Sequence, residues 1–250
     1  MMATTIPNCA GRRLDIANPD TWPAAELESL RDALLADPEV LYQELDHPAT
    51  KHDVACELRC DMMRLLYNDY EEFTAYHSCR PLNPDLYLRH GLLVTTQGRL
   101  RQRAEEWFGC IPGWEDAFQP ALNRPGKPHY VKQWYGGKVG LWFTPTPDYT
   151  GGSHFMGEMA EVLGDAGTAR HAEILRLSTP THVVCRLPKA WVWESQTEGI
   201  LMADYAGELL RAFISREYFG SPYVSHRAIH VLVDIPPNQI LELRTLEGKR

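Results

Sequence analysis

The sequence lacks the features that place a protein in a membrane or along a nucleic acid. Its longest apolar runs, such as "HGLLV" and "HVLV", are far shorter than the roughly 20 residues that a membrane-spanning helix needs. The formal net charge of −8 argues against a broad electrostatic grip on nucleic acid, although a local basic groove is still possible. Residues 1–20 show no continuous apolar stretch behind their charges. We therefore expect no membrane span, no secretory signal and a cytoplasmic protein, with secretion as an effector still open.

Several motifs of common enzymes are also missing. The chain contains no GxxxxGK[ST] phosphate loop, no GxGxxG, no GxSxG, no HExxH and no paired CxxC. These patterns mark nucleoside-triphosphate hydrolases, dinucleotide-binding Rossmann domains, α/β-hydrolases, zinc proteases and thiol redox or zinc sites. Their absence argues against these classes of protein.

Cysteine is present but makes no dense framework. The six cysteines are scattered along the chain, which suits reduced thiols, and we expect no disulfides. His52, Cys56 and Cys60 recur at every fourth position of an expected helix and could in principle ligate a metal. Structural zinc sites usually also take ligands from a turn, and no fourth ligand is evident. We interpret the two cysteines as thiols packed in a helix seam and expect no metal, with a metal-dependent hydrolase as the remaining alternative.

The residues that are present indicate a folded α+β protein. Of the 250 residues 44% are apolar, enough for a substantial core. Residues 1–20 have no apolar period and are expected to form a flexible N-terminal arm. Residues 21–250 are expected to form a single α+β domain, and its first part, 21–70, to be helical. Leucines at helical spacing in 23–37 and the pattern of 51–70 support these helices.

From residue 71 onward the pattern changes to strands with helices between them. "EEFTAYHSCR", "PTHVVCRL" and "RAIHVLVDI" are typical of strands, whereas "RLRQRAEEWFGCI", "SHFMGEMAEVLG" and "GILMADYAGELLRAFISREYF" favour helices. "PALNRPGKPH" predicts a loop. "YVKQWYGGKVGLWF" predicts a β-hairpin that turns at Gly136–Gly137, because glycine pairs adopt positive φ readily.

Three groups of residues have both a structural and a functional interpretation. "YHSCRP", residues 76–81, places a histidine, a thiol and a guanidinium in a span of four residues at the expected end of a strand. Strand alternation puts His77 and Cys79 on one face, so a His–Cys nucleophile pair is conceivable. His226 and His230 either line a cleft or are half-exposed. The aromatic residues of the hairpin (Trp134, Tyr135, Trp142 and Phe143) either form its hydrophobic core or offer a platform for a planar ring.

In this order, "YHSCRP", "GLWFTPTPDY…GGSHF" and "AIHVLVDIPPNQI" resemble the successive elements of the ADP-ribosyltransferase fold, over about residues 70–245. His77 with Ser78 and Arg80 is similar to the histidine motif of the first strand. "GLWFT" is similar to the second strand, which leads to a serine and a stacking aromatic residue. The chain departs from the family in having Ser78 where glycine is usual, and "VSHRAIH" where a catalytic glutamate is expected. "YLRHGLL" is also similar to the LRHG motif of RNA 2′-phosphotransferases, which makes His90 a further candidate.

The resemblance implies a split mixed or antiparallel β core of ADP-ribosyltransferase type, with inserted helices, that binds NAD within residues 71–250. Cleavage of the nicotinamide–ribose bond needs a group that holds the ribose, a ring that stacks the leaving group and negative charge near the sugar. His77 would hold a ribose hydroxyl, Arg80 the diphosphate, and Glu158 or Glu217 would supply the charge. Tyr149 or Phe155 would stack on nicotinamide. The remaining expected contacts to NAD are Ser78, Phe143 and Ser153.

Two functions follow from this resemblance. The first is an NAD-dependent ADP-ribosyltransferase or NAD glycohydrolase, a toxin or effector, with NAD as substrate and an acceptor that the sequence does not identify. The second is a non-catalytic module that senses a nucleotide or binds a protein through the same cleft and lacks the glutamate.

Overall fold

The computed structural model of the chain describes residues 12–47, 51–123, 134–135, 138–147, 154–194, 200–225, 227 and 229–246. It confirms a mixed α+β protein that contains a small mixed sheet. No helix among these residues is long and apolar enough to cross a membrane.

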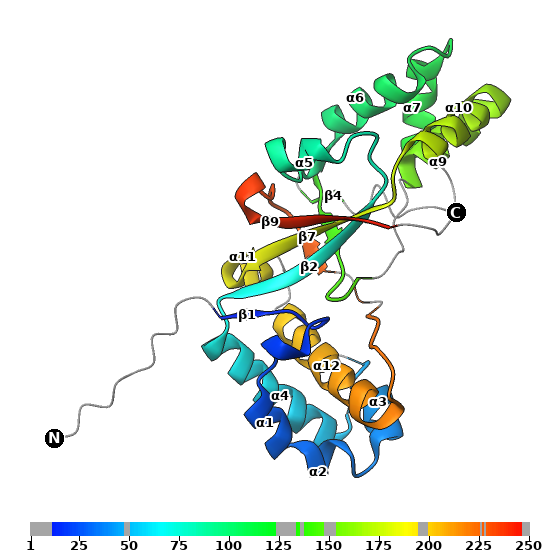
Figure 1. Ribbon diagram of the computed structural model, residues 1–250. Helices are drawn as coiled ribbons and strands as arrows, with labels where there is room; N and C mark the ends of the chain where they lie inside the picture. The colour runs from blue at the N-terminus through cyan, green and yellow to red at the C-terminus, as the bar shows by residue number, and fades with distance from the viewer. Residues whose placement is uncertain are drawn as a thin grey trace. The chain divides into compact units, whose positions relative to one another are not determined.

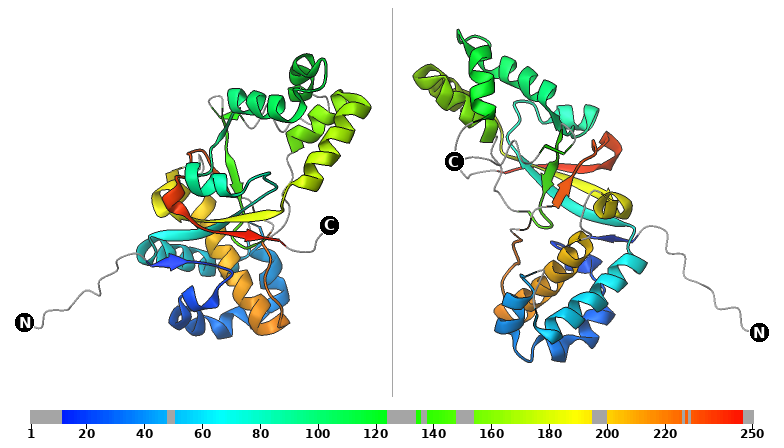
Figure 2. Two further views of the ribbon diagram at one scale, coloured as in Figure 1. Left: turned by 45° about the horizontal axis from the view of Figure 1, so that its top comes forward. Right: turned by 180° about the vertical axis from the view of Figure 1, so that it is seen from behind.

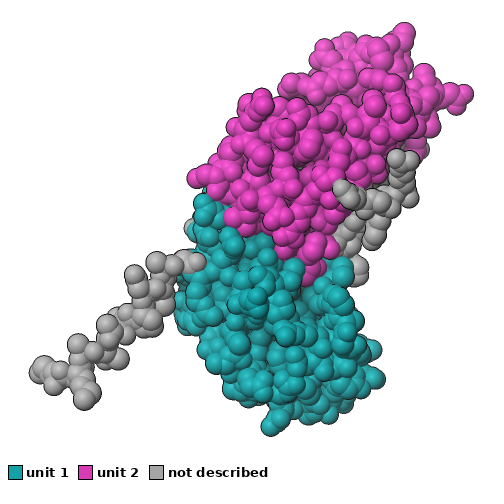
Figure 3. All heavy atoms as spheres, in the orientation of Figure 1, with its two compact units in different colours: residues 1–75, 186–227 teal, residues 76–185, 228–250 magenta. Residues whose placement is uncertain are grey.

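The chain forms two compact units (Figure 3). Unit 1 comprises residues 1–75 and 186–227, and unit 2 comprises residues 76–185 and 228–250. The boundary falls inside two strands, β2 (Glu72–Cys79) and β7 (Thr181–Pro188), each of which contributes residues to both units. That residues 21–250 behave as one domain stays a prediction.

Unit 1 is mainly helical (Figure 1). Besides its parts of β2 and β7, its elements are β1 (Arg13–Leu14), the 3₁₀-helix η1 (Pro19–Thr21), α1 (Ala24–Ser29), α2 (Arg31–Leu34), α3 (Pro38–Glu44), α4 (Asp53–Asp69), α11 (Lys189–Glu194), α12 (Ile200–Ile214) and the π-helical turn η2 (Ser215–Phe219). The predicted N-terminal helices are confirmed, although the first divides at Leu30 into α1 and α2.

The long helix α4 buries a stripe of small and apolar side chains against α12. Leu58, Met62 and Leu66 are buried, whereas Val54 is 43% exposed. The buried stripe therefore begins at Ala55 and leaves Val54 on the exposed side of the helix. Gly207 of α12 permits a close approach to the end of α3, because a Cβ there would lie 3.1 Å from the carbonyl oxygen of Leu45, the C-cap residue of α3.

The folded part of unit 1 begins within the segment expected to be a flexible arm. Strand β1 pairs in parallel with β2, with Arg13 opposite Glu72 and Leu14 opposite Phe73. Leu14 and Ile16 are completely or almost completely buried. The arm prediction is thus corrected for residues 12–20, because these two apolar side chains reach the core. Residues 1–11 lie outside the described residues.

Unit 2 combines strands with a separate group of helices. Besides its parts of β2 and β7, its elements are α5 (Asp85–His90), β3 (Thr95–Thr96), α6 (Gln97–Phe108), α7 (Trp114–Leu122), β4 (Trp134–Tyr135), β5 (Lys138–Val139), β6 (Leu141–Phe143), α9 (His154–Val162), α10 (Gly164–Leu177), β8 (Ile229–Val231), the 3₁₀-helix η3 (Pro237–Gln239) and β9 (Ile240–Thr245). Helices α6, α7, α9 and α10 lie together in each view of Figures 1 and 2 and share one core.

The strands that carry the sequence motifs are arranged around β2. The main sheet has the order β1-β2-β7-β9, and β7 and β9 are antiparallel. Tyr76 of β2 exchanges two backbone hydrogen bonds of 2.9 Å with Thr144, directly after β6. Strand β6 is in turn antiparallel to β8. The C-terminal half of β2, from Tyr76 onward, therefore has β6 as a neighbour, and β8 lies on the other side of β6.

Two predictions around the hairpin change in detail. Strands β4 and β5 are antiparallel, which confirms the hairpin, but its expected second strand breaks at Gly140 and its later half, β6, pairs with β8. The loop predicted from Pro120 is wrong for its first three residues, because α7 continues to Leu122 with Pro120 inside it. The burial of Phe118 and Leu122 on this helix offsets the hydrogen bond that a proline cannot donate. Gly136 and Gly137 lie outside the described residues.

Candidate functional site

His77 lies at the centre of the candidate site, on β2 opposite β6. Its Nδ1 atom is 2.8 Å from the backbone oxygen of Trp142, and its ring centroid is 5.6 Å from that of Phe143. Since a carbonyl oxygen can only accept, Nδ1 carries the hydrogen, and Nε2 of the neutral ring is an acceptor. The strand pairing thus orients the imidazole and selects its tautomer.

The surroundings keep His77 neutral. Partial burial lowers the pKa of His77 most, the Trp142 carbonyl raises it by a smaller amount, and the positive charges of Arg103 and His182 lower it further. A histidine with a lowered pKa is neutral at pH 7, because its ordinary value is already about 6.5. The free Nε2 can therefore accept a hydrogen bond, for example from a sugar hydroxyl.

Cys79 shares the face of His77 but is not a nucleophile in this environment. Burial raises the pKa of Cys79 to about 11, against smaller effects of a hydrogen bond from Tyr87 and the charge of Arg103, which lower it. Its Sγ atom lies 3.6 Å from the backbone oxygen of Thr181, to which the thiol donates. The reactive species would be the thiolate, which is scarce at neutral pH with such a pKa. The sulfur acts here as a packing and hydrogen-bonding group.

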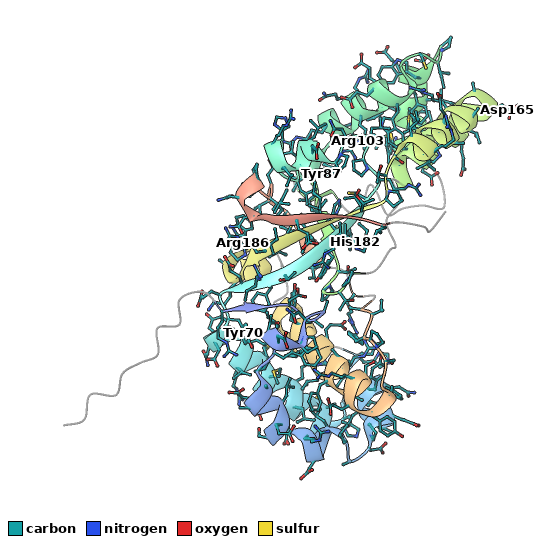
Figure 4. All side chains as sticks on the ribbon, viewed as in Figure 1. Tyr70, Tyr87, Arg103, Asp165, His182 and Arg186 are labelled. Carbon is teal, nitrogen blue, oxygen red and sulfur yellow. The ribbon has the colours of Figure 1, made fainter. Side chains whose placement is uncertain are left out.

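Two helices complete the cluster with polar groups (Figure 4). Tyr87 of α5 donates to Cys79, and burial together with this contact raises the pKa of Tyr87. The exposed side chain of Arg103, on α6, lowers the pKa of His77, Cys79 and Tyr87, so its positive charge lies near all three. We call His77, Cys79, Tyr87, Arg103 and Phe143 the His77 cluster. It offers an acceptor nitrogen, a phenol and a cation, and the buried ring of Phe143 packs against the imidazole.

Three sequence motifs meet at this cluster as neighbouring strands. His77 of β2 lies beside Phe143 of β6, and Phe143 pairs with Ile229 of β8. These strands come from "YHSCRP", "GLWFT" and "AIHVLV". The chain separations between them are long, so only the fold brings the three segments to one place.

The other predicted residues near His77 have structural partners. Arg80 donates to the backbone oxygen of Leu175 at 3.2 Å and to the Ser178 hydroxyl at 3.4 Å, where it holds the C-terminal end of α10. Its guanidinium therefore serves this helix end in the structure described. Ser78 is half-buried on the same strand, and its proposed contact with a nucleotide stays a prediction.

Phe155 and Glu158 lie on α9, and Phe155 belongs to the helical core of unit 2. Phe155 is 3% exposed and its ring centroid lies 5.5 Å from that of Phe118, so its ring is not open for stacking. Glu158 is likewise 3% exposed. Tyr149, Ser153 and His226 lie outside the described residues.

Glu217 belongs to unit 1, whereas His77 belongs to unit 2. The Glu217 carboxylate is 2.6 Å from the Arg31 guanidinium. Both residues line a cavity of about 130 Å³ together with Trp22 and Phe213. The cavity and the His77 cluster are thus in different units. We base the candidate site on the cluster, because it combines a histidine with a lowered pKa and the strands that carry the motifs.

Two further candidate histidines, His52 and His90, lie outside the cluster. Nδ1 of His52 accepts a hydrogen bond of 3.4 Å from the backbone N–H of Ala55 and caps the N-terminus of α4. Within the described part of the chain, no group of three His, Cys, Asp or Glu side chains is placed to hold a metal ion. His90 is exposed in the last turn of α5.

The sequence analysis did not predict Tyr87 and Arg103 as site residues. Tyr87 follows the turn "PLNP", and Arg103 is one of three alternating arginines in "RLRQRAEE". Nothing in those local patterns shows which arginine faces β2. The tertiary structure makes that choice.

Comparison of the chain with protein-family models, with curated proteins and with solved structures finds no match in any of the three. The interpretation of the site therefore depends on its own geometry and chemistry.

Proposed function

We propose that unit 2 binds a nucleotide of the NAD or ADP-ribose type at the His77 cluster and does not turn it over. The observation that carries this proposal is the strand order His77–Phe143–Ile229, in which β2, β6 and β8 lie side by side. These are the segments on which the resemblance to ADP-ribosyltransferases depends. Their adjacency supports a common site rather than three chance matches.

The chemistry of the cluster suits a ribose and a diphosphate. Nε2 of the neutral His77 accepts a hydrogen bond from a ribose hydroxyl, which is a donor. The exposed guanidinium of Arg103 pairs with a phosphate oxygen, because its planar donors match that geometry. In this role Arg103 replaces Arg80, whose guanidinium donates to the end of α10.

Binding without turnover is favoured by the positions of the carboxylates. Cleavage of the nicotinamide–ribose bond develops positive charge on the sugar and needs a nearby negative group. The described residues of β8 are Ile229, His230 and Val231, so this strand carries no carboxylate there. Glu217 pairs with Arg31 in unit 1.

A second candidate is catalytic, namely an NAD glycohydrolase or ADP-ribosyltransferase that uses NAD as substrate. The observation that favours it is Glu158, a buried carboxylate in the same unit as His77. A buried carboxylate near a cationic transition state stabilises it more strongly than an exposed one, because the local dielectric is low. The acceptor of the ADP-ribose would be a protein, a nucleic acid or a small molecule.

A binding assay tests the first proposal. We expect NAD and ADP-ribose to raise the melting temperature of the full chain, because a ligand of the native state adds about 2.7 kcal/mol at a concentration of about 100 Kd. Arg103→Ala is expected to weaken binding about tenfold. His77→Asn keeps a donor for the Trp142 carbonyl but withdraws Nε2, and is expected to weaken binding by a similar factor. Arg101→Ala removes the same charge from the same helix and serves as the matched control.

Measurement of nicotinamide release from NAD separates the two candidates. The binding module releases none above the protein-free rate. Release that disappears in Glu158→Gln, with the melting temperature retained, would establish the catalytic candidate instead. If neither nucleotide binds, or if Arg103→Ala and Arg101→Ala bind equally well, the site assignment is wrong.

A further inference from the structure

Strand β9 forms an edge of the main sheet. It is last in the order β1-β2-β7-β9, and Figure 1 draws it on the outer side of β7. Leu241 is 38% exposed, and the side chains of Glu242 and Arg244 are 47% and 43% exposed. Edge strands usually avoid pairing with other chains by means of proline, lysine or bulged ends. Residues 240–245 contain neither proline nor lysine, and the register shift of the β7–β9 ladder lies at the start of β9, between Ile240 and Glu242, and not at Leu243 or Thr245.

The backbone groups that face outward from β9 can be assigned from its hydrogen bonds. The N–H of Leu246 donates to the carbonyl of Pro180 at 2.9 Å, so it faces β7. Direction alternates along an antiparallel strand, and Leu243 and Thr245 pair with Val183 and Thr181. The N–H and C=O groups of Leu243 and Thr245 therefore point away from β7, and no other strand of the described residues pairs with β9 on that side.

A second β9 strand satisfies these groups in one register. If a two-fold axis passes between the Leu243 residues of two copies, each donates its N–H to the other's carbonyl in an antiparallel pair. This register places Glu242 opposite Arg244 of the second copy, and Arg244 opposite Glu242. Both charges lie on the same face of the strand, where they already form an ion pair. The charge pattern is thus complementary to itself.

From this geometry we infer that β9 is a homodimerisation edge, which pairs antiparallel with β9 of a second copy of the chain around Leu243. A second copy fits because Glu242 and Arg244 lie on either side of the axis, so both cross-strand contacts are between opposite charges. Cross-strand pairs of opposite charge stabilise a ladder, and like charges directly opposite destabilise it. The interface is small, so the dimer forms at high protein concentration.

Charge reversal tests this inference with the full chain. In sedimentation velocity the unchanged chain is expected to shift from monomer to dimer as its concentration rises. E242R and R244E each place like charges opposite one another twice, and each is expected to raise the dissociation constant about tenfold. E105R makes the same charge change on the exposed face of α6 and is expected to dimerise normally.

Mixing the two variants gives the decisive measurement. The E242R chain and the R244E chain carry complementary charges in this register, so an equimolar mixture is expected to form a heterodimer that native mass spectrometry resolves by mass. Circular dichroism checks that each variant is folded. A monomer at every concentration overturns the inference. So does a dimer that E242R and R244E leave unchanged, or a mixture that forms no heterodimer.

Discussion

His77 lies on β2 and Arg80 directly follows the last residue of that strand, yet the two serve different purposes because they face opposite sides. The His77 ring contacts β6 and is held in one tautomer, while Arg80 crosses to the end of α10. Strand alternation alone accounts for this division. The side that faces Arg103 and Tyr87 therefore carries the candidate site, and the other side carries a structural contact.

Gly91 shows how closely two backbones approach in unit 2. Its φ is +77°, and a Cβ there would lie 2.0 Å from the carbonyl oxygen of Ile235. Next to it, Leu92 and Ile235 exchange backbone hydrogen bonds of 2.9 and 2.8 Å. We expect Gly91→Ala to lower the free energy of unfolding by about 3 kcal/mol in urea titrations, from backbone strain and from this clash.

Gly113 provides the control for this substitution. Its φ is +82°, but no atom lies within 4 Å of where a Cβ would be. Gly113→Ala should therefore lower the free energy of unfolding only by about 1 kcal/mol, the cost of the left-handed conformation. Equal losses at the two positions would show that the contact with Ile235 does not matter.

Among the elements, α4 stabilises the end of α3 through a buried arginine. Arg59 donates to the carbonyls of Leu45 at 2.6 Å and His47 at 2.9 Å, just after α3. It is 6% exposed. A cation at a helix C-terminus satisfies carbonyls that have no partner within the helix and interacts well with the helix dipole.

We expect Arg59→Met to lower the free energy of unfolding by about 3 kcal/mol, because the charge-assisted hydrogen bonds to the carbonyls of Glu44, Leu45 and His47 are lost. Arg59→Lys keeps the charge but not the planar set of donors. Its free energy of unfolding should lie between those of the unchanged chain and Arg59→Met. Arg64→Met, on the same helix, removes an exposed ion pair with Asp61 and should change the free energy by less than about 0.5 kcal/mol. Urea unfolding at one pH compares all three. A large loss for Arg64→Met would mean that helix propensity, not the cap, explains the result.

Over the whole molecule, the boundary between the units falls within β2 and β7. Each of these strands contributes residues to both units. Unfolding of one unit therefore disrupts strands that also belong to the other unit. We expect a single cooperative transition, as for one domain over residues 21–250. Hydrogen exchange read by mass spectrometry during urea unfolding reports on the peptides of each unit separately.

Arg59→Met in unit 1 and Gly91→Ala in unit 2 make this expectation testable. Each substitution should move the transition of both units by the same amount. Two separate transitions, each moved only by the substitution in its own unit, would establish two domains instead.

Much of the local structure follows from the sequence. The period of apolar residues predicts α4 and α6, alternation predicts β2, and the glycine pair predicts the β4–β5 hairpin. Helix α7 was not predicted, because Pro120 indicates a loop unless buried neighbours compensate for it. The pairing of β6 with β8 was not predicted either, because nothing in "GLWF" distinguishes the rest of the hairpin from a strand far along the chain.

The sequence by itself determined many of the helices and strands and made His77 a candidate, because periodicity and short motifs are properties of neighbouring residues. The tertiary structure decided which residues join His77. It brought in Tyr87 and Arg103, turned Arg80 to the end of α10 and placed Glu217 in unit 1. Such contacts join residues that are far apart in the chain, and they depend on how all the elements pack together. No local pattern contains that information.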